Sequence, residues 1–245
     1  MFFTGLLVVA LVITLQSLYT GAEHWNGVYD APRCPIRMCL TGPPPVCEKL
    51  KMKPCYADRE VMTMFGKNFL CDTKTDGGGW ILMQRRIRPG VNFKENWQTY
   101  KEGFGTLSGD FWIGLDFIYL LMTQHNYELR IDMMYQNRSY YAKYGTFRIA
   151  NEADRFRLTI SDYSGTAGNS LNAHNNSQFY TIDRSDGYNC AAHYEAGWWF
   201  NRCYSAYLNG VWVETSRYEG IHWDALGKEV HTLQSVEMKL RKKNY

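Results

Sequence analysis

Cys71-Asp-Thr-Lys-Thr-Asp-Gly-Gly-Gly-Trp80 is the most informative stretch of this sequence, because a run of three glycines leads directly into a bulky indole. Consecutive glycines allow positive φ angles and close approach of the backbone, so the indole can pack against a tight turn. The chain has many other aromatic residues, with 12 Phe, 8 Trp and 18 Tyr. Large aromatic side chains build a core more often than they bind a ligand. We therefore predict that Gly77–Trp80 is a packing turn and that Trp112, Trp198 and Trp199 belong to the core.

The composition excludes a disordered chain and indicates no nucleic acid as an obligatory partner. Hydrophobic residues make up 45% of the sequence, which supports a substantial core. The chain has 27 Lys and Arg against 24 Asp and Glu, and this balance of +3 favours neither nucleic acid nor an acidic membrane surface. One local excess, interpreted as a solvated chain end rather than a heparin-type patch, comprises Lys239, Arg241, Lys242 and Lys243.

The first 46 residues differ from the remainder. Met1–Ala22 has no charged residue, contains the apolar run Leu6–Leu15, and ends with small residues at Thr20 and Ala22. This pattern predicts a secretory signal peptide over residues 1–22, which is too short to span a bilayer stably. No later stretch of the sequence is apolar for long enough to form a membrane span, so we expect a secreted, extracellular product. The proline-rich residues 23–46 predict an extended lead-in to one domain over residues 47–243.

Alternating side chains predict an antiparallel sheet. Apolar and polar residues alternate over Tyr127–Met133, Arg155–Ile160 and Val236–Arg241, which is typical of half-buried strands with the apolar face inward. Leu115–Met122 instead carries its apolar residues on one helical stripe. Residues 164–192 are rich in Gly, Asn, Ser and Asp and show little periodicity. We interpret this long irregular region as functional rather than as a simple connection.

Short motifs follow one another in a characteristic order along the chain. They are Cys71–Trp80, Gln84-Arg85-Arg86, Tyr100–Gly105, Gly109–Gly114, Tyr163–Gly168, Asn189-Cys-Ala191, Gly197-Trp-Trp199, Cys203 and Leu208-Asn-Gly210. In kind and order these motifs resemble the fibrinogen C-terminal (fibrinogen-related) domain family, and in particular secreted fibrinogen-related lectins of the invertebrate type. The resemblance runs from about Cys47 to Arg241. It implies an α+β fold with a central twisted antiparallel sheet, short helices and a loop-rich ligand and calcium subdomain.

The resemblance gives four of the seven cysteines a place. It implies a late disulfide between Cys190 and Cys203 and an early one between Cys47 and Cys71. A loop as long as the one closed by the late bridge stabilises a fold by roughly 3 kcal/mol in the chain-entropy model. Left over are Cys34, Cys39 and Cys55. One internal and one interchain bond would use all three and give a disulfide-linked homo-oligomer, whereas the alternative is a buried, unpaired Cys55.

A calcium loop is implied at Asp183–Cys190. Calcium takes about six to eight oxygen ligands from carboxylates, backbone carbonyls and water. Here the loop reads Asp183-Arg-Ser-Asp-Gly-Tyr-Asn-Cys190, which is shorter than usual and has Ser185 where a second carboxylate is expected. Asp183 matches the first ligand, and Asp186 would substitute if the loop changes register. Calcium is therefore the one expected cofactor, with Asp183 and Asp186 as its candidate ligands. The residues leave open whether this chain has kept or lost calcium binding.

The resemblance also implies a pocket for N-acetyl groups beside this loop. Tyr194 matches one residue of an aromatic funnel, and Arg202–Cys203 occupies the position of a cis peptide whose N–H receives the acetyl carbonyl. Tyr204 replaces the usual histidine after the cysteine, and Glu229 stands at the position of the last aromatic residue. With these replacements three alternatives stay open: the pocket is more polar, it binds a different sugar, or it binds no sugar. The candidate ligand-binding residues are Tyr194, Arg202, Cys203, Tyr204 and Tyr218.

Two sequons, Asn137-Arg-Ser and Asn175-Asn-Ser, match the pattern for N-glycosylation. In a secreted chain both Asn137 and Asn175 are candidate glycosylation sites. Because Asn175 falls in the long irregular region, we expect it to be exposed.

The sequence contains no recognisable catalytic motif. Its six histidines follow no H-E-x-x-H pattern, and it has no G-x-S-x-G elbow, P-loop or C-x-x-C motif. His193 and His222 fall near the implied pocket, and we interpret both as structural histidines. We therefore predict that the chain is not an enzyme.

The resemblance implies a secreted, lectin-like pattern-recognition protein that binds carbohydrate or acetylated groups on cell or microbial surfaces, in the setting of innate immunity. Single sites of this kind bind weakly, so disulfide-linked copies would raise the affinity through multivalency. The alternative is a secreted ligand for a protein receptor, or a matrix component, without sugar binding. Neither reading involves nucleic acid.

Overall fold

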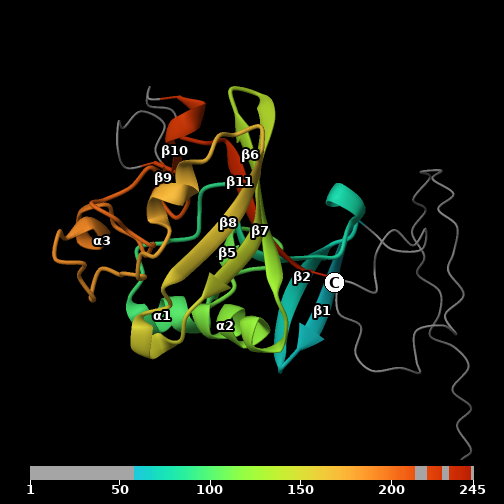
Figure 1. Ribbon diagram of the computed structural model, residues 1–245, viewed down its shortest axis with the longest axis horizontal. Coiled ribbons are helices and arrows are strands. Elements are labelled where there is room, and N and C mark those ends of the chain that lie inside the picture. Colours follow the sequence, from blue (N-terminus) through green and yellow to red (C-terminus); the bar gives the residue numbers. More distant parts are fainter. Residues whose placement is uncertain (1–57, 213–219, 228–231, 244–245) are drawn as a thin grey trace, which may run out of the picture. The chain divides into compact units, whose positions relative to one another are not determined.

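The computed structural model of the chain describes residues 58–212, 220–227 and 232–243, and a large antiparallel sheet runs through them (Figure 1). The strand order is β1-β2-β3-β11-β6-β7-β8; off this path the short strand β5 pairs with β3, and β4 pairs with β5. The strands are β1 Arg59–Met64, β2 Lys67–Asp72, β3 Trp80–Arg86, β4 Phe104–Gly105, β5 Phe111–Trp112, β6 Tyr127–Tyr135, β7 Arg138–Ile149, β8 Leu158–Gly165 and β11 Ser235–Lys242.

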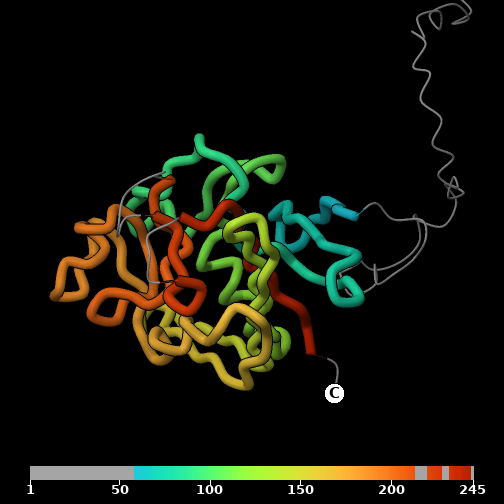
Figure 2. Tube along the Cα trace, turned by 90° about the horizontal axis from the view of Figure 1, so that it is seen from above, coloured from blue at the N-terminus to red at the C-terminus, as the bar shows by residue number. Residues whose placement is uncertain are grey.

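Short helices and a second, two-stranded sheet complete the fold. They are α1 Trp97–Glu102, α2 Leu115–Gln124, α3 Cys190–His193, the 3-10 helices η3 Thr75–Gly77, η4 Glu152–Asp154, η5 Ser170–His174 and η6 Asp224–Leu226, and the strand pair β9 Ala206–Tyr207 and β10 His222–Trp223. Helix α2 packs on α1 and on β7. The loops around α3 lie at one end of the domain, and the β1–β2 hairpin, which forms one edge of the sheet, lies at the other end (Figure 2). The predicted α+β class is confirmed, and none of the helices described is long and apolar enough to cross a membrane.

The predicted strands form with one difference. In β6 every second residue from Tyr127 to Tyr135 is buried, and β11 covers the third predicted strand. The predicted helix over residues 115–122 is α2. The strand predicted from Arg155 begins only at Leu158, because Arg155 and Phe156 have φ angles of 46° and 48° and belong to the turn after η4. Phe156 is nevertheless buried in the core.

Lys239 is buried inside the sheet, so the prediction of a solvated chain end was wrong for this residue. Its Nζ lies 2.7 Å from Asp72, 2.8 Å from Asp132 and 2.9 Å from Glu237. Burial alone would lower the pKa of Lys239, but these carboxylates raise it. Arg241 is also held in ion pairs. Both residues lie on β11, which runs between β3 and β6, and their carboxylate partners come from β2, η3, β6 and β11 itself.

Strand β3 connects motifs that are far apart in the sequence. All seven of its residues are buried, including Gln84, Arg85 and Arg86. Gln84 Nε2 donates to the Leu208 carbonyl at 2.8 Å, and Arg86 donates to the Gly210 carbonyl at 2.7 Å and to Asp110 at 3.2 Å. Arg85 donates to the carbonyls of Leu107 and Gly109. Because buried polar groups need partners, these bonds fix the segment after β9 against the sheet.

The glycine-rich turn has the predicted packing role. Gly77, Gly78 and Gly79 have φ angles of 83°, 76° and 80°. Trp80 is fully buried, and its indole N–H donates to the Thr75 carbonyl at 2.7 Å. The remaining tryptophans predicted for the core are buried as well, namely Trp112, Trp198 and Trp199.

Two alanine substitutions separate backbone conformation from steric contact in this turn. A Cβ on Gly78 would lie 2.1 Å from the Thr73 carbonyl oxygen, whereas one on Gly77 would have no atom within 4 Å. We expect Gly77→Ala to lower the free energy of unfolding by roughly 1 kcal/mol and Gly78→Ala by roughly 3 kcal/mol or more. Urea unfolding of the two variants measures the difference, and equal losses would contradict the packing role assigned to Gly78.

Candidate functional site

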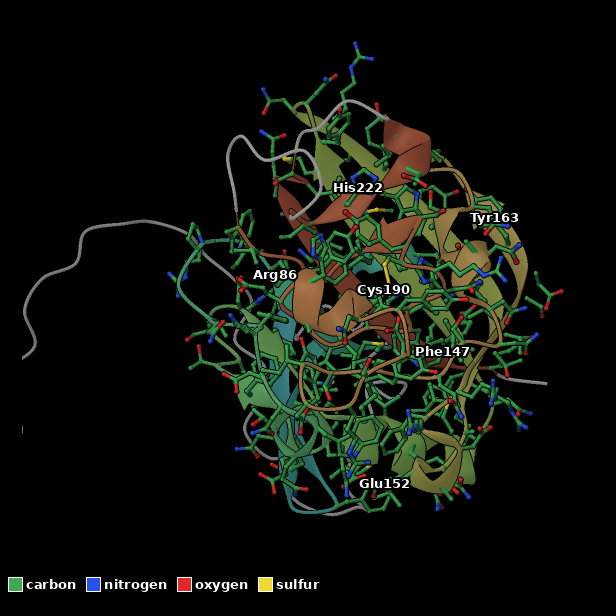
Figure 3. All side chains as sticks on the ribbon, turned by 90° about the vertical axis from the view of Figure 1, so that its left-hand side faces the viewer. Arg86, Phe147, Glu152, Tyr163, Cys190 and His222 are labelled. Carbon is green, nitrogen blue, oxygen red and sulfur yellow. A yellow bond between two sulfur atoms is a disulfide. The ribbon has the colours of Figure 1, made fainter. Side chains whose placement is uncertain are left out.

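A disulfide and a cis peptide shape the candidate site. Cys190, the first residue of α3, is bonded to Cys203, as predicted, and the Arg202–Cys203 peptide is cis, also as predicted. Figure 3 looks onto this part of the molecule, with Cys190 labelled. Cys71 is buried and disulfide-bonded as well, while its predicted partner Cys47 lies outside the described residues.

Aromatic rings gather beside the disulfide. The ring of Tyr204 lies 4.8 Å from that of Tyr194 and 5.1 Å from that of Tyr207, between ring centroids. Phe200 and Tyr207 are buried, whereas Tyr194 and Tyr204 are half-buried. The structure thus brings together two of the predicted ligand-binding residues, Tyr194 and Tyr204. The predicted Tyr218 lies outside the described residues, as does Glu229.

The Cys203 amide is an available hydrogen-bond donor at the edge of this aromatic cluster. Within the described part of the chain its N–H has no acceptor, although its carbonyl accepts from the Asn201 N–H at 2.8 Å. Cys203 is half-buried and Arg202 is exposed. An amide donor beside aromatic rings suits a ligand that offers a carbonyl oxygen and a small apolar group together.

His174 holds the segment that follows Cys203, a role that the sequence patterns did not indicate. Its Nε2 accepts the backbone N–H of Ser205 at 3.1 Å and that of Ala206 at 3.0 Å. Since Nε2 acts as an acceptor, Nδ1 carries the hydrogen and donates to the Trp199 carbonyl at 2.7 Å. Burial lowers the pKa of His174 to about 4, so the ring stays neutral near neutral pH.

The loop over residues 183–189 uses its polar side chains to hold itself together. Asp183 Oδ1 accepts the Trp97 N–H at 2.9 Å and the Thr181 hydroxyl at 2.7 Å. Asp186 Oδ1 accepts the backbone N–H of Tyr188 at 3.0 Å and that of Cys190, the first residue of α3, at 3.1 Å. Asp186 Oδ2 is buried and lacks a hydrogen-bond partner among the described residues. Ser185 bonds to Asn189 at 3.0 Å.

The two sequons differ in accessibility. Asn137 is exposed in the turn between β6 and β7. Asn175 was expected to be exposed, but it is half-buried. Its Oδ1 accepts the Ile160 N–H at 3.0 Å. Both remain predicted glycosylation sites, and Asn137 presents the more open side chain.

Sequence comparison finds relatives across most of the chain. The family described as "Fibrinogen beta and gamma chains, C-terminal globular domain" matches residues 57–243. Techylectin-5A of Tachypleus tridentatus is 42% identical over 190 residues, which cover 74% of this chain and 65% of that protein. Human Fibrinogen C domain-containing protein 1 is 40% identical over 188 residues, covering 72% of this chain. The match spans only 41% of the length of that human protein.

Solved structures share the fold. The fibrinogen-like globe domain of human ANGPTL6 aligns with a TM-score of 0.75 at 32% identity, over 84% of this chain and 100% of that chain. A lamprey fibrin D-dimer, complexed with the peptide Gly-His-Arg-Pro-amide, aligns with a TM-score of 0.69 at 28% identity. That alignment covers 83% of this chain and 79% of the lamprey chain.

The fold and its aromatic loop site define a globular binding domain. The chain belongs to the fibrinogen C-terminal domain family. This family is a non-enzymatic binding domain, in agreement with the prediction that the chain is not an enzyme, and its domains are typically extracellular.

Domains of this family often bind calcium, but the 183–189 loop of this chain offers the ion few ligands besides the buried Oδ2 of Asp186, which lacks a partner among the described residues. Calcium needs about six to eight oxygen ligands. Asp183 and Asp186 each accept hydrogen bonds from two protein donors through one carboxylate oxygen. The Arg155 guanidinium donates to the Ser185 carbonyl at 3.5 Å. No group of three or more His, Cys, Asp or Glu residues in the described ranges could hold a metal ion.

We predict that acid weakens the fold through His174. Its pKa falls from 6.5 to about 4 on folding, so the unfolded chain binds the proton more readily. The contribution of His174 is therefore complete above pH 6.5 and is lost as the pH falls toward 4, by roughly 3 kcal/mol in total. Urea unfolding at a series of pH values measures this loss.

Variants of two histidines make that measurement specific. His174→Phe leaves two backbone N–H groups unsatisfied, so it should cost roughly 3 kcal/mol at neutral pH and flatten the acid-dependent loss. His125→Ala, at the exposed C-terminal end of α2, should keep the wild-type pH dependence. An unchanged pH profile in His174→Phe would contradict the assignment.

Calcium should not stabilise this protein. An ion that binds the folded state stabilises it by about 2.7 kcal/mol at a free concentration one hundred times its Kd. We expect the same melting temperature in calcium, in a chelator, and in magnesium as a control for ionic strength. A melting temperature that rises with calcium alone would show that Asp183 and Asp186 bind the ion after all.

Proposed function

We propose that this chain is a lectin-like recognition protein whose site around Cys203 binds acetylated sugars. The observation that carries the proposal is the Cys203 N–H, which has no acceptor among the described residues, beside the rings of Tyr194 and Tyr204. In this proposal the N–H donates to the acetyl carbonyl and the rings pack against the acetyl methyl group. Arg202 completes the rim of the site. Tyr218 would belong to it as well, as the sequence predicts.

The site would act without calcium in the 183–189 loop. Asp183 and Asp186 already accept hydrogen bonds from backbone N–H groups, among them that of Cys190 in α3, and these bonds hold the loop in place. Binding would then resist a chelator, in contrast to a lectin whose loop needs the ion.

A setting outside the cell supports the proposal. The predicted signal peptide, the domain family and the lectin relative Techylectin-5A agree with a secreted protein that recognises cell or microbial surfaces in innate immunity. Copies linked through Cys34, Cys39 or Cys55 would add avidity to weak single sites. These cysteines lie outside the described residues, and the linkage stays a prediction.

A protein or peptide ligand is the second candidate. The lamprey fibrin D-dimer of similar fold is complexed with a short peptide amide, so this fold also accommodates peptide ligands. Binding to a protein receptor without sugar recognition would correspond to that use.

Retention on an N-acetylated resin tests the proposal. We expect the wild-type chain to be retained with or without a chelator and to be eluted by free N-acetylglucosamine. Tyr204→Ala should weaken binding about tenfold or more, which corresponds to 1.4 kcal/mol. Tyr140→Ala provides the matched control, since Tyr140 on β7 also packs partly buried against the core.

No retention of wild-type protein under either condition would refute the acetyl-binding function and leave the peptide-binding alternative. Equal losses in the Tyr204 and Tyr140 variants would place the site elsewhere. Circular dichroism of each variant shows whether the fold is kept.

A further inference from the structure

His222 enters the aromatic cluster from a different part of the chain. It lies on β10, which pairs with β9 so that His222 is opposite Tyr207. The imidazole centroid lies 5.5 Å from the Tyr204 ring, and the side chain is 16% exposed. Figure 3 labels His222 in the same view as Cys190. The residue is thus neither core nor free surface, but part of the wall beside the proposed site.

Asp224 fixes the orientation of this imidazole. His222 Nε2 lies 2.7 Å from Asp224 Oδ1, and because an ionised carboxylate only accepts, Nε2 donates in this bond. The Asp224 backbone N–H donates to the Ser205 carbonyl at 2.9 Å, which ties the pair to the segment after Cys203. The imidazole is therefore held by a carboxylate that is itself anchored next to the site.

The other ring nitrogen of His222, Nδ1, is not hydrogen-bonded to Asp224. With Nε2 committed to Asp224, Nδ1 makes no hydrogen bond to any residue in the described ranges. In the neutral ring Nδ1 is an acceptor with a lone pair directed away from Asp224. A polar atom without a partner, in a side chain that is only 16% exposed, has hydrogen-bonding capacity left for a ligand.

We propose that His222 is a specificity-determining residue, whose Nδ1 accepts a hydrogen bond from a hydroxyl of the sugar that carries the acetyl group. The inference rests on the proposed function. Tyr204 directly follows Cys203 in the chain and contacts His222 with its ring. A ligand that is anchored by its acetyl group at the Cys203 N–H and extends across Tyr204 reaches the imidazole. The preferred ligand class is therefore an N-acetylated sugar with a free hydroxyl, rather than an acetyl group alone.

Two substitutions distinguish the two nitrogens. The amide nitrogen of His222→Gln can replace Nε2 and keep the bond to Asp224, but this variant loses Nδ1. The amide of His222→Asn places a polar atom near Nδ1 and loses the bond to Asp224. Both variants lack the imidazole, so both lose the same contact between the His222 ring and the Tyr204 ring.

The experiment compares two probes by NMR titration. N-acetylglucosamine carries the acetyl group and hydroxyls, whereas N-ethylacetamide carries the acetyl group alone. We expect wild-type protein to prefer the sugar. His222→Gln should weaken sugar binding about tenfold, without changing the affinity for N-ethylacetamide. His222→Asn should keep more of the sugar preference than His222→Gln.

Each result decides a separate point. Unchanged sugar affinity in His222→Gln would overturn the inference, and so would an equal loss for both probes, since that would mean a purely structural role. Wild-type binding to neither probe would refute the proposed function itself. Melting temperatures of both variants identify any loss of folding.

Discussion

Buried backbone groups must be hydrogen-bonded, and in the segment Ser205–Gly210 side chains from elsewhere in the fold meet this need. His174 accepts the N–H groups at the start of the segment. Gln84 and Arg86 of β3 donate to carbonyls at its end. The segment follows directly after Cys203 and Tyr204, so the position of the proposed site depends on these few side chains. An unsatisfied buried group costs roughly 1–3 kcal/mol, which makes each of these bonds significant for the local structure.

The sequence predicted the strands reliably where the burial of one face sets the pattern of side chains. Alternation of apolar and polar residues predicted β6 and β11 because it reports which face of a strand meets the core. It does not report what covers the opposite face. Lys239 was therefore expected in solvent, although carboxylates on β2, β6 and β11 surround its Nζ. Pairing across β11 depends on strand order, which local spacing does not contain.

The candidate site divides in the same way. The resemblance to the family implied the Cys190–Cys203 disulfide and the cis peptide before Cys203, because these are local features at fixed positions in the family's motifs. From the sequence we interpret His222 as a structural histidine, and the sequence patterns assign no role to His174. Their roles arise from contacts with residues far along the chain, such as the bonds from His174 to the segment after Cys203. No spacing rule identifies such contacts, whereas the folded structure shows them directly.

An NMR experiment with paired labels tests most directly whether the Cys203 amide binds the acetyl group. Labelling arginine at the carbonyl carbon and cysteine at the amide nitrogen selects Arg-Cys peptides, which are Arg33–Cys34 and Arg202–Cys203 in this sequence. If the Cys203 amide binds the acetyl carbonyl, N-acetylglucosamine will shift the Cys203 signal and leave that of Cys34 in place. Binding of the sugar with an unmoved Cys203 signal would contradict binding at this amide.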